Sequence, residues 1–298
     1  MMAHAVGSSV TSANATAAAL RLVWRRIRRN WPSAIALAVI VVMILAALLA
    51  PWITPYDADE TDPAAALQAL SWHHPLGTDI YGRDLLSRII YAARVDLAVS
   101  FGATALALAI GATIGAISGL YRGWADLIIM RCVDSVMAFP AFILAMAITA
   151  ALGNSVGNVL VAIAITQIPT YLRLVRGEIL RIREMEYADA ARVVGNPPWR
   201  IVFVHLLPNC LPPIIVQATL AMGYALLTMA ALSFIGLGIR PPQSEWGSMT
   251  AEGAQYIVTG EWWLFLFPGL AIVIMVLAFN LVGDALRDFL DPRMRGVR

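Results

Sequence analysis

Residues 31–53 read WPSAIALAVIVVMILAALLAPWI, a run without a single charged side chain. A helix that crosses the hydrocarbon core of a bilayer needs about 20 mostly apolar residues, so this run predicts a transmembrane helix. Five more apolar stretches follow it along the chain. They cover approximately residues 97–120, 132–152, 159–174, 214–237 and 262–282. We therefore expect an all-α integral membrane protein with six transmembrane helices.

The composition of the 298 residues supports a membrane protein. Hydrophobic residues make up 60% and charged residues 13% of the chain, and the mean hydropathy is +0.74. Soluble domains are closer to half apolar and a quarter charged, so a cytosolic globule and a disordered chain are excluded. The net charge of +2 gives no indication of a nucleic-acid partner. Only two cysteines are present, Cys132 and Cys210, which argues against a disulfide framework and a cysteine-rich zinc site.

The distribution of arginine predicts how the chain lies in the membrane. The sequence contains no lysine. Of its 21 arginines, 17 lie before the first apolar stretch, between the second and third, at or after the end of the fourth, or after the sixth. These four segments share one side of the membrane if every stretch crosses it. Because basic residues accumulate on the cytoplasmic side, this side and both termini are expected to be cytoplasmic. The predicted organisation is then a cytoplasmic N-terminal tail (1–30), a first helix (31–53), an external loop (54–96), a five-helix core (97–285) containing a cytoplasmic loop (176–208) and an external loop (239–261), and a cytoplasmic C-terminal tail (286–298).

Several familiar catalytic and binding motifs fail on their context. Without lysine, neither a Walker A phosphate loop nor a Schiff base is possible. The GxSxG pattern at 153–157 falls in a predicted turn between two spans, whereas a nucleophile elbow requires a strand, a turn and a helix. The adjacent His73 and His74, with Asp79 and Asp84, lack the helical spacing of a metal-binding motif. We expect no catalytic residue and no metal site in this chain.

Small and charged residues within the spans predict packing contacts. Gly111, Gly115 and Gly119 share one helix face, and small residues at this spacing let two backbones approach closely in a membrane. Asp134 follows Arg131 by three residues, so we expect a structural ion pair between them. No series of Asp, Glu or His crosses the membrane, which argues against a proton-coupled carrier.

The predicted cytoplasmic loop has its own helical pattern. Residues 178–194 have a helix-forming composition, Gly195 ends that helix, Asn196-Pro197-Pro198 forms a break, and a second segment follows at 199–207. Two short helices outside the membrane suit a docking surface. A solvated connector is the alternative interpretation.

Two groups of residues resemble known family motifs. Asp189-Ala190-Ala191, Gly195 and His205-Leu206-Leu207-Pro208 resemble the EAA motif of ABC-importer permeases. The external loop is similar to the signature of the dipeptide/oligopeptide/nickel permease family, in its second-permease (C-type) branch. Its matching residues are His74-Pro75-Leu76-Gly77-Thr78-Asp79 and Gly82-Arg83-Asp84. The resemblance runs from about Arg21 to Arg293. It departs from the family at Asp189, which is usually Glu, and at 196–198, where Ala-Ser usually follows the glycine.

The resemblance implies a fold, a location and a set of partners. The fold is the type I ABC-importer permease fold in the bacterial inner membrane. The partners are a second permease subunit in a heterodimer, two cytoplasmic ATPase subunits or domains that bind ATP and Mg²⁺, and an external peptide-binding protein. The chain itself would hold no cofactor. Glu186, one helical turn before Asp189, is a candidate to share its role in ATPase coupling.

The resemblance leaves the solute and the role of the external motif open. Relatives carry dipeptides, oligopeptides, D-amino-acid dipeptides, glutathione or nickel, and a short peptide is the expected solute here. The external motif either orders the loop beside the binding-protein dock or forms a buried turn in which Arg83 pairs with Asp79 or Asp84. Two rival functions are a channel or scaffold that works without ATP, and an intramembrane enzyme.

Overall fold

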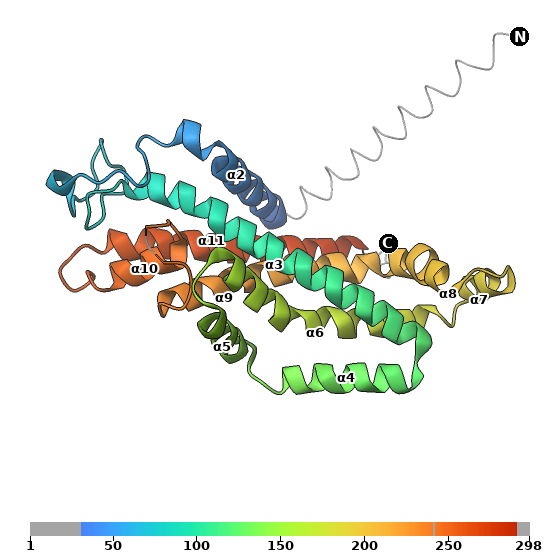
Figure 1. The fold of residues 1–298 in the computed structure, drawn as a ribbon. Helices are drawn as coiled ribbons and strands as arrows, with labels where there is room; N and C mark the ends of the chain where they lie inside the picture. The colour runs from blue at the N-terminus through green and yellow to red at the C-terminus, as the bar shows by residue number, and fades with distance from the viewer. Residues whose placement is uncertain (1–30, 241, 291–298) are drawn as a thin grey trace, which may run out of the picture.

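The computed structural model of the chain describes residues 31–240 and 242–290, and all its regular structure is helical within these ranges. Figure 1 shows an elongated helix bundle with short helices at both ends. One end carries α7 (Glu186–Val193) and α8 (Pro198–Arg200), and the other carries α10 (Trp246–Ala254) and the loop 54–84. We call these the α7 end and the α10 end.

Five helical segments of the described chain are long and apolar enough to cross a membrane, and a bent pair of helices makes a sixth if the pair is counted as one span. The single helices are α2 (Trp31–Ile53), α3 (Leu85–Tyr121), α6 (Val156–Ile182) and α11 (Trp263–Leu290). The fifth segment runs from α8 through a π-helical turn, η2 (Ile201–Leu206), and a 3₁₀ turn, η3 (Leu207–Cys210), into α9 (Leu211–Phe234). The predicted all-helical membrane architecture is confirmed, with five candidate spans among the described residues, or six when the bent pair is counted as one span.

The third predicted span, 132–152, is two helices instead of one. Helix α4 (Gly123–Met137) and helix α5 (Ala141–Leu152) meet at a bend of 88°. The bend falls at Phe139-Pro140 because proline lacks an amide hydrogen and disfavours the helical conformation of the residue before it. The prediction from apolar length alone did not take Pro140 into account.

Four further helix boundaries differ from the prediction. Helix α3 begins at residue 85, not 97, because Asp84 caps it by accepting from the Ser87 amide, and the mostly apolar residues 85–96, which include four polar or charged ones, continue it without a break. The external loop is therefore 54–84. Helix α6 extends to residue 182, and the expected helix 178–194 is interrupted by an extended residue, Met185. Helix α11 continues to residue 290, so part of the expected tail 286–298 is helical, and the predictions about residues 1–30 and 291–298 lie outside the described residues.

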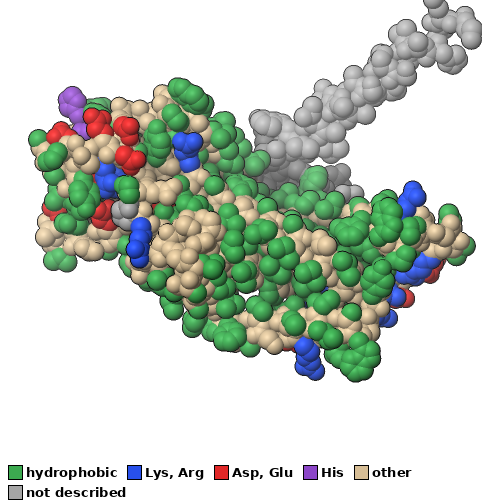
Figure 2. All heavy atoms as spheres, viewed as in Figure 1, with side chains coloured by type: hydrophobic (Ala, Val, Ile, Leu, Met, Phe, Trp, Pro, Cys, Tyr) green, Lys and Arg blue, Asp and Glu red, His purple; other side chains and the backbone are tan. Residues whose placement is uncertain are grey.

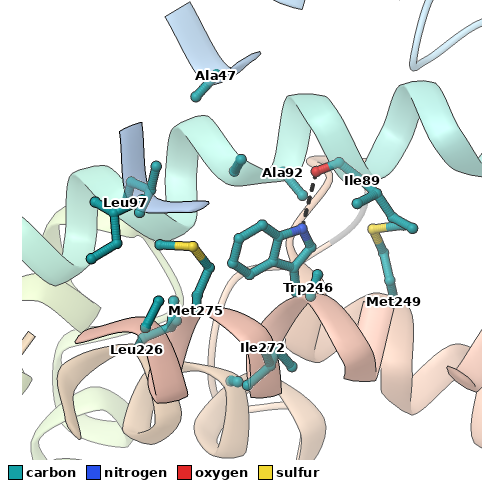
Figure 3. Packing of buried hydrophobic residues seen from close by; sticks show 14 of the residues in the cluster. Ala47, Ile89, Ala92, Leu97, Leu226, Trp246, Met249, Ile272 and Met275 are labelled. Carbon is teal, nitrogen blue, oxygen red and sulfur yellow. Dashed lines mark hydrogen bonds between the residues drawn. The ribbon is translucent and has the colours of Figure 1, made fainter. Parts of the chain in front are cut away.

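Three hydrophobic clusters hold the helices together. The cluster nearest the α10 end surrounds the buried Trp246, whose indole N–H donates to the carbonyl of Ile89 at 3.0 Å. Figure 3 shows this indole between α3, α10 and α11, with Met249 and Ile272 close by. The other two clusters join α3, α6 and α9, first with α5 and then, toward the α7 end, with the short helices after α6. This core fixes α3 as the element that connects the two ends.

Candidate functional sites at the two ends of the bundle

The α7 end presents a short helix on a small apolar base. Ala188 and Ala191 of α7 are buried against Ile201, Val202 and Leu206 of the following helical turns. Because alanine has only a methyl group, α7 lies close to this base. The opposite face of α7, which carries Asp189 and Ala190, is exposed.

The residues that follow α7 form an exposed apolar tip. Val193 is 87% exposed, and Val194 and Trp199 are also largely exposed. Gly195 has φ +83°, and a β-carbon built on it would meet nothing within 4 Å. Such an apolar patch outside the spanning segments is typical of a surface that binds another protein.

The structure places the other predicted residues of this loop at different depths. Glu186 and Pro208 are exposed, and His205 is half-buried, with no hydrogen-bond partner for its Nε2 atom among the described residues. Glu186 and Asp189 lie in the first turn of α7, where carboxylates are favourable toward the helix dipole. The loop thus combines an exposed acidic turn with an exposed apolar tip.

Two arginines that the sequence analysis did not single out attach α7 to the rest of the chain. Arg192 donates to Asp189 Oδ1 at 2.6 Å and to the backbone carbonyl of Arg183 at 3.1 Å. Arg183 in turn donates to the carbonyls of Gly119 and Leu120 at 3.1 and 2.8 Å, at the C-terminal end of α3. A cation is favourable there because the last carbonyls of a helix carry partial negative charge. These contacts connect α7 to α3, and only their side-chain types were visible in the sequence.

The glycine face of α3 lies directly against α6. A β-carbon on Gly111 would come within 2.7 Å of Tyr171 Cβ, one on Gly115 within 2.5 Å of the Leu172 carbonyl, and one on Gly119 within 2.9 Å of Ile179. Side chains at these positions would push the helices apart, so the three glycines set the distance between α3 and α6.

Ion pairs join α4 to α6, and one of them corrects a sequence expectation. Arg176 binds both carboxylate oxygens of Asp126, at 2.6 and 2.7 Å. Asp134 pairs with Arg173 of α6 at 2.5 Å, and not with Arg131 as expected. The expectation used only spacing within one helix, whereas the bend at Pro140 leaves α4 alongside α6, where Arg173 is within reach.

At the α10 end, Asp79 is the centre of a buried charge network. Its Oδ2 atom accepts from Arg83 Nε and from Arg88 at 2.6 Å each, and its Oδ1 atom accepts from the backbone amides of Tyr81 and Arg83. All three charged side chains are nearly fully buried. Arg88 also reaches Ser244 at 3.3 Å and Glu252 at 3.6 Å, and so ties the external loop to α10. Of the two pairings left open for Arg83, the structure contains the one with Asp79.

The rest of the external motif surrounds this network. Asp84 caps α3 and accepts from His74 Nδ1 at 3.0 Å. The buried Thr78 pairs with Asp84 in an isolated antiparallel bridge, and its carbonyl accepts from the indole of Trp263 in α11. His74 and Pro75 are the start of this turn, and His74 stacks on Tyr56 with ring centroids 4.8 Å apart.

Two glycines of the motif have no space for a side chain. A β-carbon on Gly77 would lie 2.8 Å from the Trp263 indole nitrogen, and one on Gly82 would lie 1.8 Å from the Asp62 carbonyl oxygen. Both residues have positive φ, at +82° and +75°. Glycine is therefore required at both positions by conformation and by space.

A pair of buried carboxylates lies beside Trp246. Glu245 caps α10 by accepting from the amides of Gly247 and Ser248 at 2.7 Å each. Asp96 of α3 interacts with Glu245, and its Oδ2 atom accepts from the Trp246 amide at 3.3 Å. Burial raises the pKa of the Glu245 carboxyl, against the opposing effect of its amide donors. The sequence did not predict that these two residues are neighbours, because their proximity depends on the fold.

The motifs that failed on sequence context are structural elements here. Ser155 of the GxSxG pattern caps α6 by accepting from the Asn158 amide. Among the described residues, no cluster of three or more His, Cys, Asp or Glu side chains suits a metal ion. His74 and Asp84 form a pair, as described above, and Asp79 is occupied by two arginines.

Comparison with known proteins identifies the relatives of this chain. Residues 111–296 match the family described as the binding-protein-dependent transport system inner membrane component. Residues 19–69 match the N-terminal TM domain of oligopeptide transport permease C.

Curated relatives match over almost the whole length. The dipeptide transport system permease protein DppC of Alkalihalophilus pseudofirmus is 46% identical over 275 residues, which are 92% of this chain and 90% of the relative. The probable D,D-dipeptide transport system permease protein DdpC of Escherichia coli is 42% identical, covering 93% of this chain and 92% of the relative. The glutathione transport system permease protein GsiD of Pectobacterium atrosepticum is 41% identical, covering 91% of this chain and 90% of the relative.

Proposed function

This chain belongs to the family of binding-protein-dependent transport system inner membrane components, as a C-type permease of an ABC importer, and we propose that the solute it translocates is a short peptide. It is a multi-pass inner-membrane protein. The peptide assignment is supported by relatives whose names describe dipeptide, D,D-dipeptide and di/tripeptide permeases. The glutathione permease among them shows that similar chains serve other solutes.

The proposed orientation places the α7 end in the cytoplasm. Figure 2 shows blue arginine side chains at the α7 end and red acidic side chains gathered at the α10 end. The few arginines at the α10 end include Arg83 and Arg88, which are buried and paired with Asp79. The arginines that can contact water are therefore distributed even more unequally between the two ends than all arginines are. Their excess lies at the α7 end, which the positive-inside rule assigns to the cytoplasm.

ATP hydrolysis is assigned to partner subunits. A permease with no lysine cannot form a Walker A loop, so ATP and Mg²⁺ would be bound by two cytoplasmic ATPase subunits or domains. A second permease would complete a heterodimer, and an external binding protein would deliver the peptide to the α10 end, where the loop 54–84 and α10 form the rim. The chain would carry no catalytic residue and no cofactor of its own.

The proposal that cytoplasmic ATPase subunits bind this chain rests on the exposed face of α7. Ala190 and Asp189 are directed away from the apolar base, and the tip Val193-Val194-Gly195 has open space around it. This arrangement suits insertion of the helix into a cleft of an ATPase subunit. Closure of the ATPase pair would then move α7 and, through Arg183, the end of α3. A ligand drives such a change only if it binds the two states with different affinity.

Replacing Ala190 with arginine tests this arrangement. Ala190→Arg adds a large cation to the exposed face without touching the buried base, so the chain should still insert. Removing one partner of a desolvated interfacial charge pair typically costs about 2–5 kcal/mol, and a bulky cation in the cleft should cost a similar amount. The expected result is loss of the ATPase subunit in a pull-down and loss of peptide-stimulated ATP turnover. Gly195→Val should weaken the same interaction less.

The matched control makes the same change at the opposite end. Val258 is exposed in the loop between α10 and α11, and Val258→Arg should retain the ATPase in the pull-down. If Ala190→Arg keeps full ATPase binding and stimulated turnover, the loop is a solvated connector and not the element that couples the permease to the ATPase. Uptake of a labelled dipeptide by the reconstituted complex, in competition with glutathione and Ni²⁺, tests the solute class separately.

A further inference from the structure

Most spanning helices of this chain expose apolar side chains, as contact with lipid requires. On α2 the exposed residues include Val41, Val42 and Leu45, and on α11 they include Val273 and Leu277. Helix α6 differs. Thr166, Thr170, Arg173 and Gly177 recur at intervals of three or four residues, so they lie on one face of the helix, and Thr170, Arg173 and Gly177 are exposed. We call these four residues the α6 polar stripe.

The α6 polar stripe continues onto α4 through an ion pair that the other described residues of this chain leave exposed. Arg173 binds Asp134 at 2.5 Å, and the two side chains are 42% and 47% exposed. Ser135, next to Asp134, is also exposed. An ion pair this exposed contributes little to stability where water surrounds it. The neighbouring bidentate pair between Arg176 and Asp126 is less exposed and already joins α4 to α6.

The Arg173–Asp134 pair lies between two candidate spanning segments, α6 and the bent pair of α4 and α5. Leu172, next to Arg173, packs against Gly115, six residues or roughly 9 Å before the C-terminal end of α3, so the pair lies alongside the spanning helix α3 and not beyond its end. A charged side chain in hydrocarbon costs about 2.5–3.5 kcal/mol on insertion scales. Charged residues at such depths almost always face a bundle interior or a water-filled cavity.

We propose that the α6 polar stripe and Asp134 line the aqueous path of the transported solute, and that Arg173 and Asp134 bind the carboxylate and the ammonium group of a zwitterionic peptide. The planar guanidinium matches a carboxylate with two parallel hydrogen bonds, and the carboxylate of Asp134 complements an ammonium group. Each side chain already has a partner that the solute can replace, so binding is weak and release is fast, as transport requires. The identity of the solute rests on the proposed function, whereas the aqueous path does not.

Thiol labelling of the assembled importer in proteoliposomes tests the path. The native cysteines are first removed as Cys132→Ser and Cys210→Ala, because Cys132 is itself exposed. In this background Thr170→Cys and Val273→Cys place one thiol on the α6 polar stripe and one on the apolar face of α11. We expect a charged, membrane-impermeant methanethiosulfonate to modify Thr170→Cys at least tenfold faster. Equal, slow rates would show that a partner subunit or lipid covers the stripe and would overturn the proposal; Thr166→Cys repeats the test if Thr170→Cys does not assemble.

Protection by peptide tests the role of Arg173. With binding protein and ATP present, a dipeptide should slow the labelling of Thr170→Cys at least threefold when Arg173 is intact. It should not slow this labelling when Arg173→Gln is also present. Arg173→Lys should retain part of the effect of the dipeptide on the labelling rate. A merely structural Arg173 would leave protection unchanged in Arg173→Gln, and that result would overturn the binding role. If the parent complex transports dipeptide while Thr170→Cys stays unreactive, this inference fails and the proposed function stands. If Thr170→Cys reacts rapidly but no dipeptide is transported, the peptide assignment fails and the aqueous path stands.

Discussion

At the α10 end the Asp79 carboxylate lies between two arginines and is 3% exposed, whereas at the α7 end the Asp189 carboxylate has one arginine partner and is 64% exposed. Both residues belong to motifs that combine an acid with a positive-φ glycine. The external motif is folded into the interior and determines the shape of its own loop. The α7 motif leaves its glycine and its acid available to another molecule. Similar residue types therefore serve internal structure at one end and an interface at the other.

The largest effect is expected from Asp79→Ala. It leaves Arg83 and Arg88 buried without their main partner, and removing one partner of a buried ion pair typically costs about 3–5 kcal/mol. We expect little assembled complex, and rapid proteolysis within the loop 54–84 in what remains. Glu60→Ala, at an exposed position of the same loop, is the control and should behave as wild type. Normal yield and protease resistance for Asp79→Ala would show that the network is not what orders this end.

Gly77→Ala and Gly195→Ala compare the two ends at almost the same φ, +82° and +83°. An L-residue in this conformation costs roughly 1–2 kcal/mol at either position. At Gly77 the new methyl group also clashes with the Trp263 indole, and overpacking adds typically about 1–3 kcal/mol, whereas at Gly195 nothing lies within 4 Å. The midpoint temperature of thermal unfolding in detergent should therefore fall further in Gly77→Ala than in Gly195→Ala. Equal losses of stability would contradict the contrast between a packed and an open end.

The sequence was sufficient for the architecture and insufficient for the networks. Apolar length predicted six spans, and the spacing of Gly111, Gly115 and Gly119 identified a face that the structure places against α6. The bend before Pro140, the pairing of Asp134 with Arg173, and the proximity of Asp96 to Glu245 depend on which helices become neighbours. Local spacing carries no information about such contacts. It gave Arg131 as the partner of Asp134 because only one helix was considered.

Arg183→Gln tests how loosely the α7 end is attached. The substitution removes the contact of a cation with the last carbonyls of α3, and a hydrogen bond to a charged group contributes about 1.5–3 kcal/mol. We expect amide hydrogen exchange in residues 186–194 to accelerate roughly tenfold, which corresponds to about 1.4 kcal/mol, while the spans remain protected. Arg287→Gln changes an exposed arginine on α11 and should leave this exchange unaltered. Unchanged exchange in Arg183→Gln would mean that the buried Ala188 and Ala191 alone hold α7 in place.

The smallest effect concerns pH and the carboxyl of Glu245. Burial raises its pKa, so the folded chain retains a proton that the unfolded chain releases at the ordinary glutamate value of about 4.3. Where the folded state binds more protons, stability falls as pH rises. The stabilising contribution is therefore complete below pH about 4.3 and is lost as the pH rises through the folded-state pKa.

Glu245→Gln isolates this contribution from the other acids. The variant cannot ionise and keeps one oxygen for the amides of Gly247 and Ser248, so it should be slightly less stable at low pH and lose less stability on raising the pH. The groups that face Glu245 are Asp96 from α3 and Ser233 from α9, and neither is a cation that would favour the ionised form. We expect the difference in Tm between the variant and wild type to change by about 2 °C between acid and neutral pH, which corresponds to somewhat less than 1 kcal/mol. Parallel pH profiles of Tm would show that Glu245 is ionised in the folded protein, and that its two amide donors at the start of α10 outweigh burial.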